Sequence, residues 1–286
     1  MRADRLTSVQ HAGLVFPIVD TGPIDGTPVL LLHGWPQDGG SWTSVADELA
    51  ASGYRTFAPT LRGAVASANP RRRRAFRSGE LLEDVVAIIE AIGMPVHLVG
   101  HDWGAALAWT VAARRADLVR TLTAVSVPHP AVFLKALRGP RQASKSWYMA
   151  LFQLPLLPEL GLASTAVRTR ALRSSGQSPA GARRDAARLH THALRRGGLH
   201  WYRGAPLTRP IDLGGPVSVP VLQVWSDQDV AIARSTIERS RDYAAGEYEL
   251  VVLGGVSHWI PDEAPAELAR MVHGHIHRSV GRGVVS

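Results

Sequence analysis

The sequence predicts an α/β protein in which helices flank an open, mostly parallel sheet and an all-helical segment interrupts the strands. Short apolar runs rich in Val, Ile and Leu are typical of buried parallel strands. They occur at residues 29–32, 96–99, 122–127, 221–225 and 248–253. Between two of them, residues 80–92 place their apolar side chains on one helical stripe, and Gly93 can end that helix. This alternation favours βαβ units, whose ligand sites lie beyond the carboxyl ends of the strands.

The region between residues 130 and 213 has no strand pattern. Residues 147–157, 163–172 and 182–195 instead have patterns compatible with helices. We therefore expect a core formed by residues 1–130 and 213–286 and a helical insert formed by residues 131–212. Within the insert, the segment LFQLPLLPELGLA is unusually apolar, and Pro155 and Pro158 prevent one straight helix there. This segment could line a pocket or seat the insert on the core.

Size and composition favour one elaborated, soluble and cytoplasmic domain without a membrane partner. The chain has 286 residues, of which 45% are hydrophobic and 20% charged, and these values are close to globular averages. No apolar run approaches the roughly 18 residues that a membrane span requires. The cysteine count is 0, which excludes disulfides and thiolate metal sites.

The positive charge of the chain does not predict a nucleic-acid partner. The net charge is +8, and arginine supplies nearly all of the positive charge because Lys135 and Lys145 are the only lysines. The one dense cluster, Arg71 to Arg74, follows a turn-rich stretch, and no aromatic-interleaved nucleic-acid motif accompanies it. We expect a solvated loop, with a charged partner or an acidic substrate as the alternative.

The most informative motif is VHLVGHDWGAALAW, in which a predicted strand runs into Gly100-His101-Asp102-Trp103-Gly104 and a helical pattern follows at once. This is the layout of a nucleophile elbow, where flanking glycines leave room for a strained turn that exposes the central side chain. A carboxylate is ionised at neutral pH and can attack a saturated carbon. Asp102 is therefore the candidate nucleophile, with an alkyl ester as the intermediate. The alternative is that Asp102 only caps the following helix.

The stretch LLLHGWPQDGGSW brings another predicted strand to His33-Gly34-Trp35-Pro36. A flexible glycine and a free backbone N–H at this point suit the binding of a developing oxyanion. The backbone amides of Trp35 and Trp103 are the candidate donors. The Trp35–Pro36 bond is a candidate cis bond because only X-Pro bonds are readily cis. An HGxP string by itself is often only a turn.

Two later strands lead to candidates for an acid and a base. VPVLQVWSDQDVAI leads to Asp227 and Asp229, and EYELVVLGGVSHWIPDEAP leads to His258. The order nucleophile, acid, histidine is the order of hydrolases with this elbow. His258 can take a proton from water if a carboxylate fixes its tautomer. The residues alone leave both aspartates open as that carboxylate.

The other closely spaced histidines do not predict a metal site. The sequence has no HExxH motif and no cysteine partner for them. We expect these histidines on the surface: His190, His192, His273, His275 and His277. We expect neither a metal nor an organic cofactor.

With HGWP at 33–36, GHDWG at 100–104 and the acid and histidine loops in order, the sequence resembles the epoxide hydrolases of the α/β-hydrolase superfamily over nearly its whole length. The resemblance implies an α/β-hydrolase fold with an inserted all-helical cap. It also implies that Asp229, the last position of a WGxxD-like pattern, is the acid. Asp227 is then a turn residue and the fallback.

The resemblance further implies two cap tyrosines that hydrogen-bond an epoxide oxygen. Tyr148 precedes Phe152-Gln153 at the matching distance, and Tyr202 lies in HWYR. A phenol can donate to a strained ether oxygen and protonate the developing alkoxide, whereas the alternative for each tyrosine is packing in the cap. We expect the substrate to contact Trp35, Trp103, Phe152 and Leu154.

Two positions depart from the family pattern. His200 stands where asparagine is usual, and Thr60 follows Pro59 where an aspartate is expected. Neither position belongs to the expected mechanism. The two departures indicate a divergent member of the family.

Together these residues predict a monomeric or homodimeric enzyme that converts a small-molecule epoxide to a vicinal diol. Asp102 attacks while Tyr148 and Tyr202 polarise the oxygen, and His258, oriented by Asp229, then activates water. A haloalkane or haloacid dehalogenase shares the aspartate nucleophile and is the first alternative. A non-catalytic binding protein on the same fold is the second. An esterase is the weakest, because it normally has serine or cysteine at this position.

Overall fold

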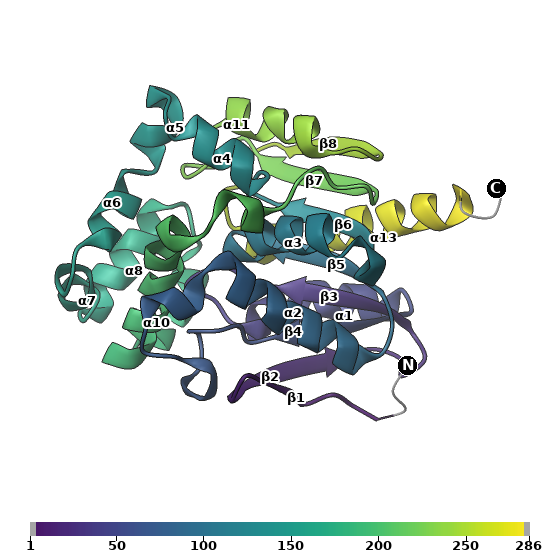
Figure 1. Cartoon of the computed structure of the whole chain (residues 1–286), viewed down its shortest axis with the longest axis horizontal. Coiled ribbons are helices and arrows are strands. Elements are labelled where there is room, and N and C mark those ends of the chain that lie inside the picture. Colours follow the sequence, from purple (N-terminus) through teal and green to yellow (C-terminus); the bar gives the residue numbers. More distant parts are fainter. Residues whose placement is uncertain (1–3, 283–286) are drawn as a thin grey trace.

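The computed structural model describes residues 4–282, and its centre is an eight-stranded sheet (Figure 1). The strand order is β1-β2-β4-β3-β5-β6-β7-β8. β1 pairs antiparallel with β2 and β2 with β4, and the remaining pairs are parallel. The strands are β1 Ser8–His11, β2 Leu14–Thr21, β3 Thr27–Leu32, β4 Tyr54–Pro59, β5 Val96–His101, β6 Val119–Val125, β7 Val221–Ser226 and β8 Tyr248–Leu253. The mostly parallel sheet expected from the sequence is confirmed.

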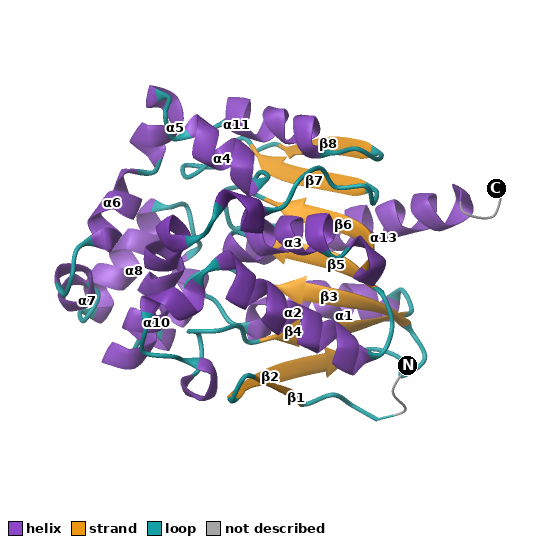
Figure 2. Ribbon diagram, viewed as in Figure 1, coloured by secondary structure: helices purple, strands orange, loops and turns teal. Residues whose placement is uncertain are grey.

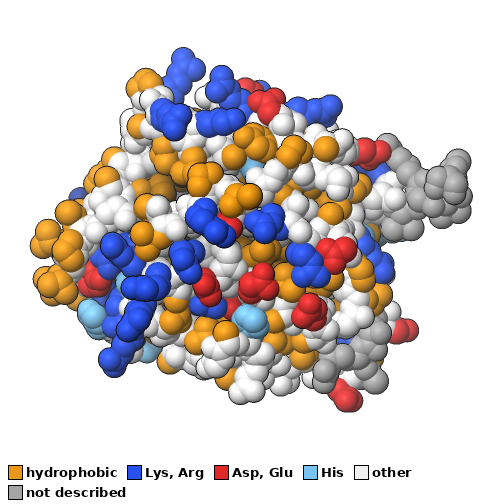
Figure 3. All heavy atoms as spheres, viewed as in Figure 1, with side chains coloured by type: hydrophobic (Ala, Val, Ile, Leu, Met, Phe, Trp, Pro, Cys, Tyr) orange, Lys and Arg blue, Asp and Glu red, His pale blue; other side chains and the backbone are white. Residues whose placement is uncertain are grey.

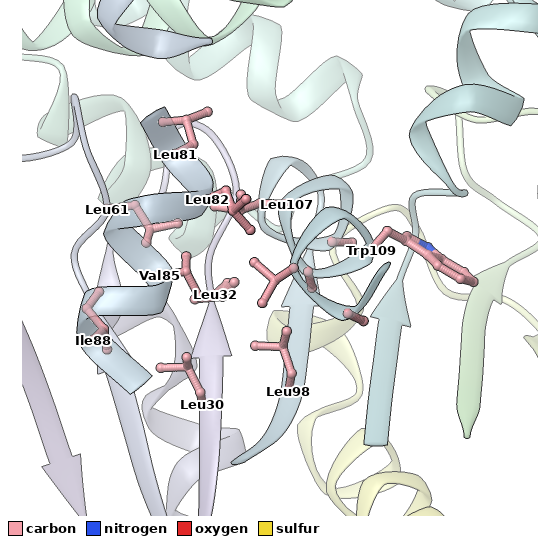
Figure 4. Close-up of a cluster of buried hydrophobic side chains, with 14 of the residues drawn as sticks. Leu30, Leu32, Leu61, Leu81, Leu82, Val85, Ile88, Leu98, Leu107 and Trp109 are labelled. Carbon is pink, nitrogen blue, oxygen red and sulfur yellow. The ribbon is translucent and has the colours of Figure 1, made fainter. Parts of the chain in front are cut away.

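Helices cover both faces of this sheet (Figure 2). On one face, α2 (Ser78–Ile92) and α3 (Trp103–Arg114) contribute to one buried cluster with side chains of β3 and β5. Figure 4 shows Val85 and Ile88 of α2 beside Leu30 and Leu98 of the strands. On the other face, α1 (Thr43–Ala51) packs against α13 (Pro265–Arg282) in a second cluster. α2 ends at Gly93, whose φ of 85° is favourable for glycine, as the sequence predicts.

The segment between β6 and β7 is helical throughout its regular elements, and we call it the helical insert (residues 130–213). Among its described residues no strand occurs. Its α-helices are α4 Pro130–Ala136, α5 Pro140–Lys145, α6 Trp147–Gln153, α7 Leu157–Gly161, α8 Thr165–Ser174, α9 Pro179–Arg188 and α10 His192–Gly204. The division of the chain into two structural units at residues 131 and 212 stays a prediction.

Two of the expected helices of the insert are wrong in extent. Residues 147–157 are not one helix, because α6 ends at Gln153 and α7 begins only at Leu157, with Pro158 in its first turn. Residues 182–195 belong to two helices. The Thr191 hydroxyl accepts the backbone N–H of Leu194 and thereby begins α10 as a separate helix.

The arginine cluster lies at the surface, as expected. Arg71 to Arg74 are all exposed, and the last two begin a short 3-10 turn, η3 (Arg73–Phe76). Across residues 4–282, no helix combines the length and the apolar character needed to cross a membrane.

Candidate active site

Asp102 occupies the sharp turn between β5 and α3. Its φ of 52° lies in a region that non-glycine residues rarely adopt, and α3 begins at the next residue. A Cβ on Gly100 would collide with the carbonyl of Gly104, and one on Gly104 would collide with the carbonyl of Leu32. The glycines of the motif are therefore required by the close approach of strand and helix, which turns the Asp102 side chain outward at the end of the sheet.

The Asp102 carboxylate contacts an amide and an imidazole. Its Oδ1 accepts the backbone N–H of Trp35 at 2.9 Å, and its Oδ2 lies 3.6 Å from Nε2 of His258. Burial opposes ionisation of this carboxyl, but the hydrogen bond and charge of His258, together with the amide of Trp103, outweigh burial and lower its pKa below the ordinary value of 3.8. Asp102 is thus ionised at neutral pH, with both proposed oxyanion amides directed at it.

Asp229, and not Asp227, is the aspartate that the structure brings to His258. Asp229 Oδ2 lies 2.8 Å from His258 Nδ1, while its Oδ1 accepts the backbone N–H groups of Ala231 and Ile232 at 2.7 and 2.8 Å. Asp227 is exposed, and its Oδ1 accepts the amide of Gly255 at 2.8 Å. Asp227 therefore holds a turn.

His258 lies between two carboxylates and is held by its backbone as well. Burial opposes protonation of the imidazole, but the charge of Asp229 and the hydrogen bonds to Asp102 and Asp229 raise its pKa to about 10. The carbonyl of His258 accepts a hydrogen bond from the Ser126 hydroxyl at 2.9 Å and lies 2.9 Å from Nε2 of His101. The sequence did not assign these positioning contacts, although His101 is part of the elbow motif.

The two tyrosines come from separate helices of the insert and face the same cavity as Asp102. Tyr148 lies on α6 and Tyr202 on α10, and their ring centroids are 6.1 Å apart. Burial, followed by the charges of Asp102 and Asp229, raises the pKa of Tyr148. Burial, followed by Tyr148 and Asp102, raises the pKa of Tyr202 well above its ordinary value. Both phenols are therefore protonated hydrogen-bond donors at neutral pH.

The cavity has a volume of about 110 Å³ and is mostly apolar. Its polar groups include Asp102, Tyr148 and Tyr202. Side chains whose contribution the sequence did not predict form much of its wall: Leu107, Phe133, Met149, Trp201 and Ile232. Trp201 and Met149 could have been found as the sequence neighbours of Tyr202 and Tyr148.

Comparison with known proteins places the chain in a family. A family described as the alpha/beta hydrolase fold matches residues 27–265. Epoxide hydrolase 3 of Xenopus tropicalis is 30% identical over 277 residues, which cover 92% of this chain and 75% of the relative. The chain belongs to the epoxide hydrolase family of α/β hydrolases.

Two further matches agree with this membership. Epoxide hydrolase A of Mycobacterium tuberculosis is 27% identical, and the match covers 91% of this chain and 93% of the relative. A solved structure from work on novel epoxide hydrolases in metagenomes from hot environments has a TM-score of 0.83 at 26% identity and covers 95% of this chain and 98% of that one.

Of the four residues expected to contact substrate in this epoxide hydrolase family member, the structure does not bring Leu154 to the cavity. α6 ends before Leu154, whose side chain is exposed at the surface. Phe152 does not line the cavity. Its ring packs edge-on against those of Trp35 and Tyr202, with centroid distances of 5.6 and 5.0 Å. Trp103 lines the cavity together with Asp102. Trp35 does not line it, but lines a smaller cavity to which Trp103 also contributes.

The two departures from the epoxide hydrolase pattern have structural partners. His200 is buried, and its Nε2 donates to the carbonyl of Arg71 at 3.0 Å, which fastens α10 to the arginine cluster. Burial lowers the pKa of His200, so the ring is neutral. The Thr60 hydroxyl accepts the amide of Gly39 at 3.3 Å. A separate expectation concerned the HGWP motif, and its Trp35–Pro36 bond is cis.

Two of the remaining histidines lie together, since the ring centroids of His273 and His277 are 4.3 Å apart. Within residues 4–282, no group of three or more His, Cys, Asp or Glu side chains is arranged to hold a metal ion. His190, His192 and His277 are exposed and His273 is half-buried. The expectation of a surface position is wrong for His275, which is buried with its Nε2 3.3 Å from the carbonyl of Pro220.

Proposed function

We propose that this chain hydrolyses an epoxide to a vicinal diol through a covalent ester on Asp102. The observation that carries the proposal is the meeting of one ionised carboxylate and two protonated phenols in a single apolar cavity. An epoxide needs both groups, because its carbon must be attacked while its oxygen takes up a proton. The curated relatives named epoxide hydrolases support the same substrate class.

In the first half of the reaction, an Asp102 oxygen forms a bond to an epoxide carbon, and the carbon–oxygen bond of the ring breaks. The electron pair goes to the ring oxygen, which takes a proton from Tyr148 or Tyr202. Both phenols hold their protons at neutral pH because burial and the charge of Asp102 raise their pKa values. The apolar wall excludes water, so these donors act in a low-dielectric site.

In the second half, water attacks the carbonyl carbon of the ester. Esterification removes the charge of Asp102, which is one cause of the raised pKa of His258. His258 therefore gives up its proton more readily in the intermediate, and this proton restores the phenol that protonated the ring oxygen. The neutral imidazole, oriented by Asp229, then takes a proton from water. The amides of Trp35 and Trp103 stabilise the resulting oxyanion. When it collapses, the bond between the carbonyl carbon and the alkyl oxygen breaks, the leaving oxygen takes the proton of the regenerated Asp102 carboxyl, and the diol leaves. Water and these residues suffice for the chemistry.

The tyrosine pair also separates the proposal from its first rival. A halide leaves without a proton, so a dehalogenase has no use for two phenols beside its nucleophile. In this chain both phenols line the cavity together with Asp102. Epoxide opening therefore gives both phenols a role, whereas halide displacement leaves them without one.

Diol formation from a panel of terminal and internal epoxides tests the proposal. We expect diol from the wild-type chain and none from Asp102→Asn. With enzyme in excess in heavy-oxygen water, the first-turnover diol should carry an unlabelled oxygen from Asp102. Label in that first diol would indicate direct attack by water and contradict the ester. Epoxide binding without turnover would favour the binding protein, and halide release from haloalkanes with no diol from any epoxide would favour the dehalogenase.

A further inference from the structure

The outer side of the helical insert carries large exposed apolar side chains. Trp147, Leu156, Leu157 and Leu160 each expose between 61% and 68% of their surface. We call the full set the leucine surface, and it consists of Trp147, Leu151, Leu154, Leu156, Leu157, Leu160 and Val167. Figure 3 shows apolar side chains gathered at the end of the molecule where Figure 1 places α7. Such concentrations of exposed apolar groups mark interaction sites in soluble proteins.

Buried contacts beneath the leucine surface hold its side chains at the exterior. Arg203 is buried beneath it, where its guanidinium donates to the carbonyls of Phe152 and Leu154 at 2.8 and 2.6 Å. The same guanidinium pairs with Glu159 at 2.9 Å. Leu156 has a φ of 64°, a conformation that is strained for leucine and persists only where the surroundings enforce it. Arg203 thus holds the loop after α6 and, through Glu159, the helix α7 in place at the surface.

The helix that begins this surface also forms the cavity wall. On α6, Tyr148 and Met149 line the cavity, whereas Trp147 and Leu151 belong to the exposed side. Residues four apart share one side of a helix. Both sides of α6 are therefore apolar, and one of them has no partner among the described residues.

The charges around the leucine surface are almost all positive. Residues 130–207 include thirteen Lys and Arg residues but only two acids, Glu159 and Asp185. Both acids are buried and paired with arginines, so no carboxylate of this stretch is exposed. The exposed arginines that flank the surface on α8 are Arg170 and Arg173, and no ion pair of either is found within the described part of the chain. Figure 3 shows basic side chains on either side of the apolar end.

Exposed apolar side chains surrounded by positive charge favour one kind of partner. Two copies of the chain placed face to face would oppose positive charge to positive charge, which disfavours association. An anionic bilayer matches both features, because apolar side chains enter the boundary between headgroups and acyl chains while arginines meet anionic headgroups. We propose that the leucine surface docks this protein peripherally on an anionic lipid bilayer. The lack of a long apolar run bears only on membrane-spanning helices, so peripheral docking departs from the expectation of no membrane partner without conflicting with that observation. Docking does not rest on the proposed reaction.

Vesicle co-sedimentation of the full chain tests the proposal. We expect binding to vesicles of phosphatidylcholine and phosphatidylserine in a roughly 3:1 mixture, and little binding to phosphatidylcholine alone. Binding should weaken with added salt, because salt screens the arginine contribution. Failure to bind the mixed vesicles, or equal binding to both kinds, would overturn the proposal.

Two variants and a matched control locate the surface. Leu157→Ser/Leu160→Ser should reduce vesicle affinity at least about tenfold, because these side chains supply inserted apolar area, and Arg170→Ala/Arg173→Ala should flatten the salt dependence. The control is Ile211→Ser, which removes an apolar side chain that is 73% exposed outside the leucine surface, and it should bind like the wild type. Circular dichroism checks that each variant is folded.

The same preparations exclude the rival partners. If sedimentation equilibrium shows a dimer that Leu157→Ser/Leu160→Ser abolishes while neither protein binds vesicles, the surface pairs two copies and the proposal is wrong. Unchanged vesicle binding by the serine variant would be equally contradictory. Hydrolysis of a water-soluble epoxide should be the same in all variants, so failure of docking and failure of the proposed reaction can be told apart.

Discussion

The Nδ1 atom of His258 lies 2.8 Å from Oδ2 of Asp229, and the imidazole thereby spans the gap between this buried acid and Asp102. Since Asp229 both orients the ring and raises its pKa, removal of its charge should impair water activation more than alkylation. We expect Asp229→Asn to lower kcat about 10²- to 10⁴-fold and the ester to accumulate. Stopped-flow and steady-state kinetics with one epoxide measure the two steps.

Asp227→Asn is the matched control for that variant. Its carboxylate is exposed and accepts the amide of Gly255, so the kcat of this variant should remain within about twofold of the wild type. Equal losses in the two variants would show that the assignment of the acid to Asp229 is wrong.

The tyrosine pair should act on the alkylation step. Tyr148→Phe and Tyr202→Phe each remove a proton donor from the cavity, and each should slow alkylation by an epoxide about 10- to 100-fold, with a larger loss in the double variant. Tyr248→Phe serves as control, because its buried hydroxyl has no hydrogen-bond partner within the described structure. Wild-type alkylation rates in both single variants would remove the phenols from the mechanism.

The pH dependence of alkylation follows from the lowered pKa of Asp102. The reactive form is the carboxylate, and a pKa below 3.8 keeps it ionised as the pH falls. The raised pKa values of both phenols keep the donors protonated as the pH rises. The single-turnover alkylation rate should therefore be flat from about pH 5 to about pH 9. An acid limb near neutrality would mean that the nucleophile is not stabilised as its carboxylate.

A buried ion pair supports the cavity wall and should dominate local stability. Arg62 and Asp84 are buried and lie 2.6 Å apart, and the carbonyl of Arg62 accepts the indole N–H of Trp201 at 2.8 Å. Asp84→Leu leaves a buried guanidinium without its partner, so the free energy of unfolding should fall by about 3–5 kcal/mol. Arg62→Met/Asp84→Leu should lose less than the sum of the single variants. Urea denaturation measures these differences.

An exposed ion pair provides the comparison for that experiment. Arg234 and Glu238 form a helical i,i+4 pair on the surface, and Glu238→Gln should cost at most about 0.5 kcal/mol. A similar small effect of Asp84→Leu would contradict the structural role of the Arg62–Asp84 pair.

Continuous apolar runs predict most of the parallel strands, including β8, whose residues are mostly half-buried or exposed. β5 and β7 are buried along their whole length, so continuous apolar runs identify them. β4 was missed because its YRTFAP sequence includes Arg55, a charged residue that is fully buried. Its guanidinium pairs with Asp20 of β2 at 2.7 Å. A local pattern cannot anticipate a partner thirty-five positions away.

The residues of the site divide in the same way into those that a local pattern identifies and those that depend on distant partners. The elbow and the strand-end residues could be predicted because β5, β7 and β8 bring their carboxyl ends to one edge of the sheet. Leu154 could not be placed, because Arg203, almost fifty residues later, binds its carbonyl and fixes the loop at the surface. The residues alone likewise could not decide between Asp227 and Asp229. The structure shows that the amides of Ala231 and Ile232 orient the Asp229 carboxylate.

The most direct test of the central claim is the intact mass of His258→Ala after exposure to an epoxide. Without its water activator the variant should retain the ester, so its mass should increase by that of one whole epoxide, with the adduct on the peptide that contains Asp102. The increase should disappear in Asp102→Asn/His258→Ala. An adduct on another residue, or no adduct from epoxides that the wild-type chain converts to diols, would contradict covalent catalysis by Asp102.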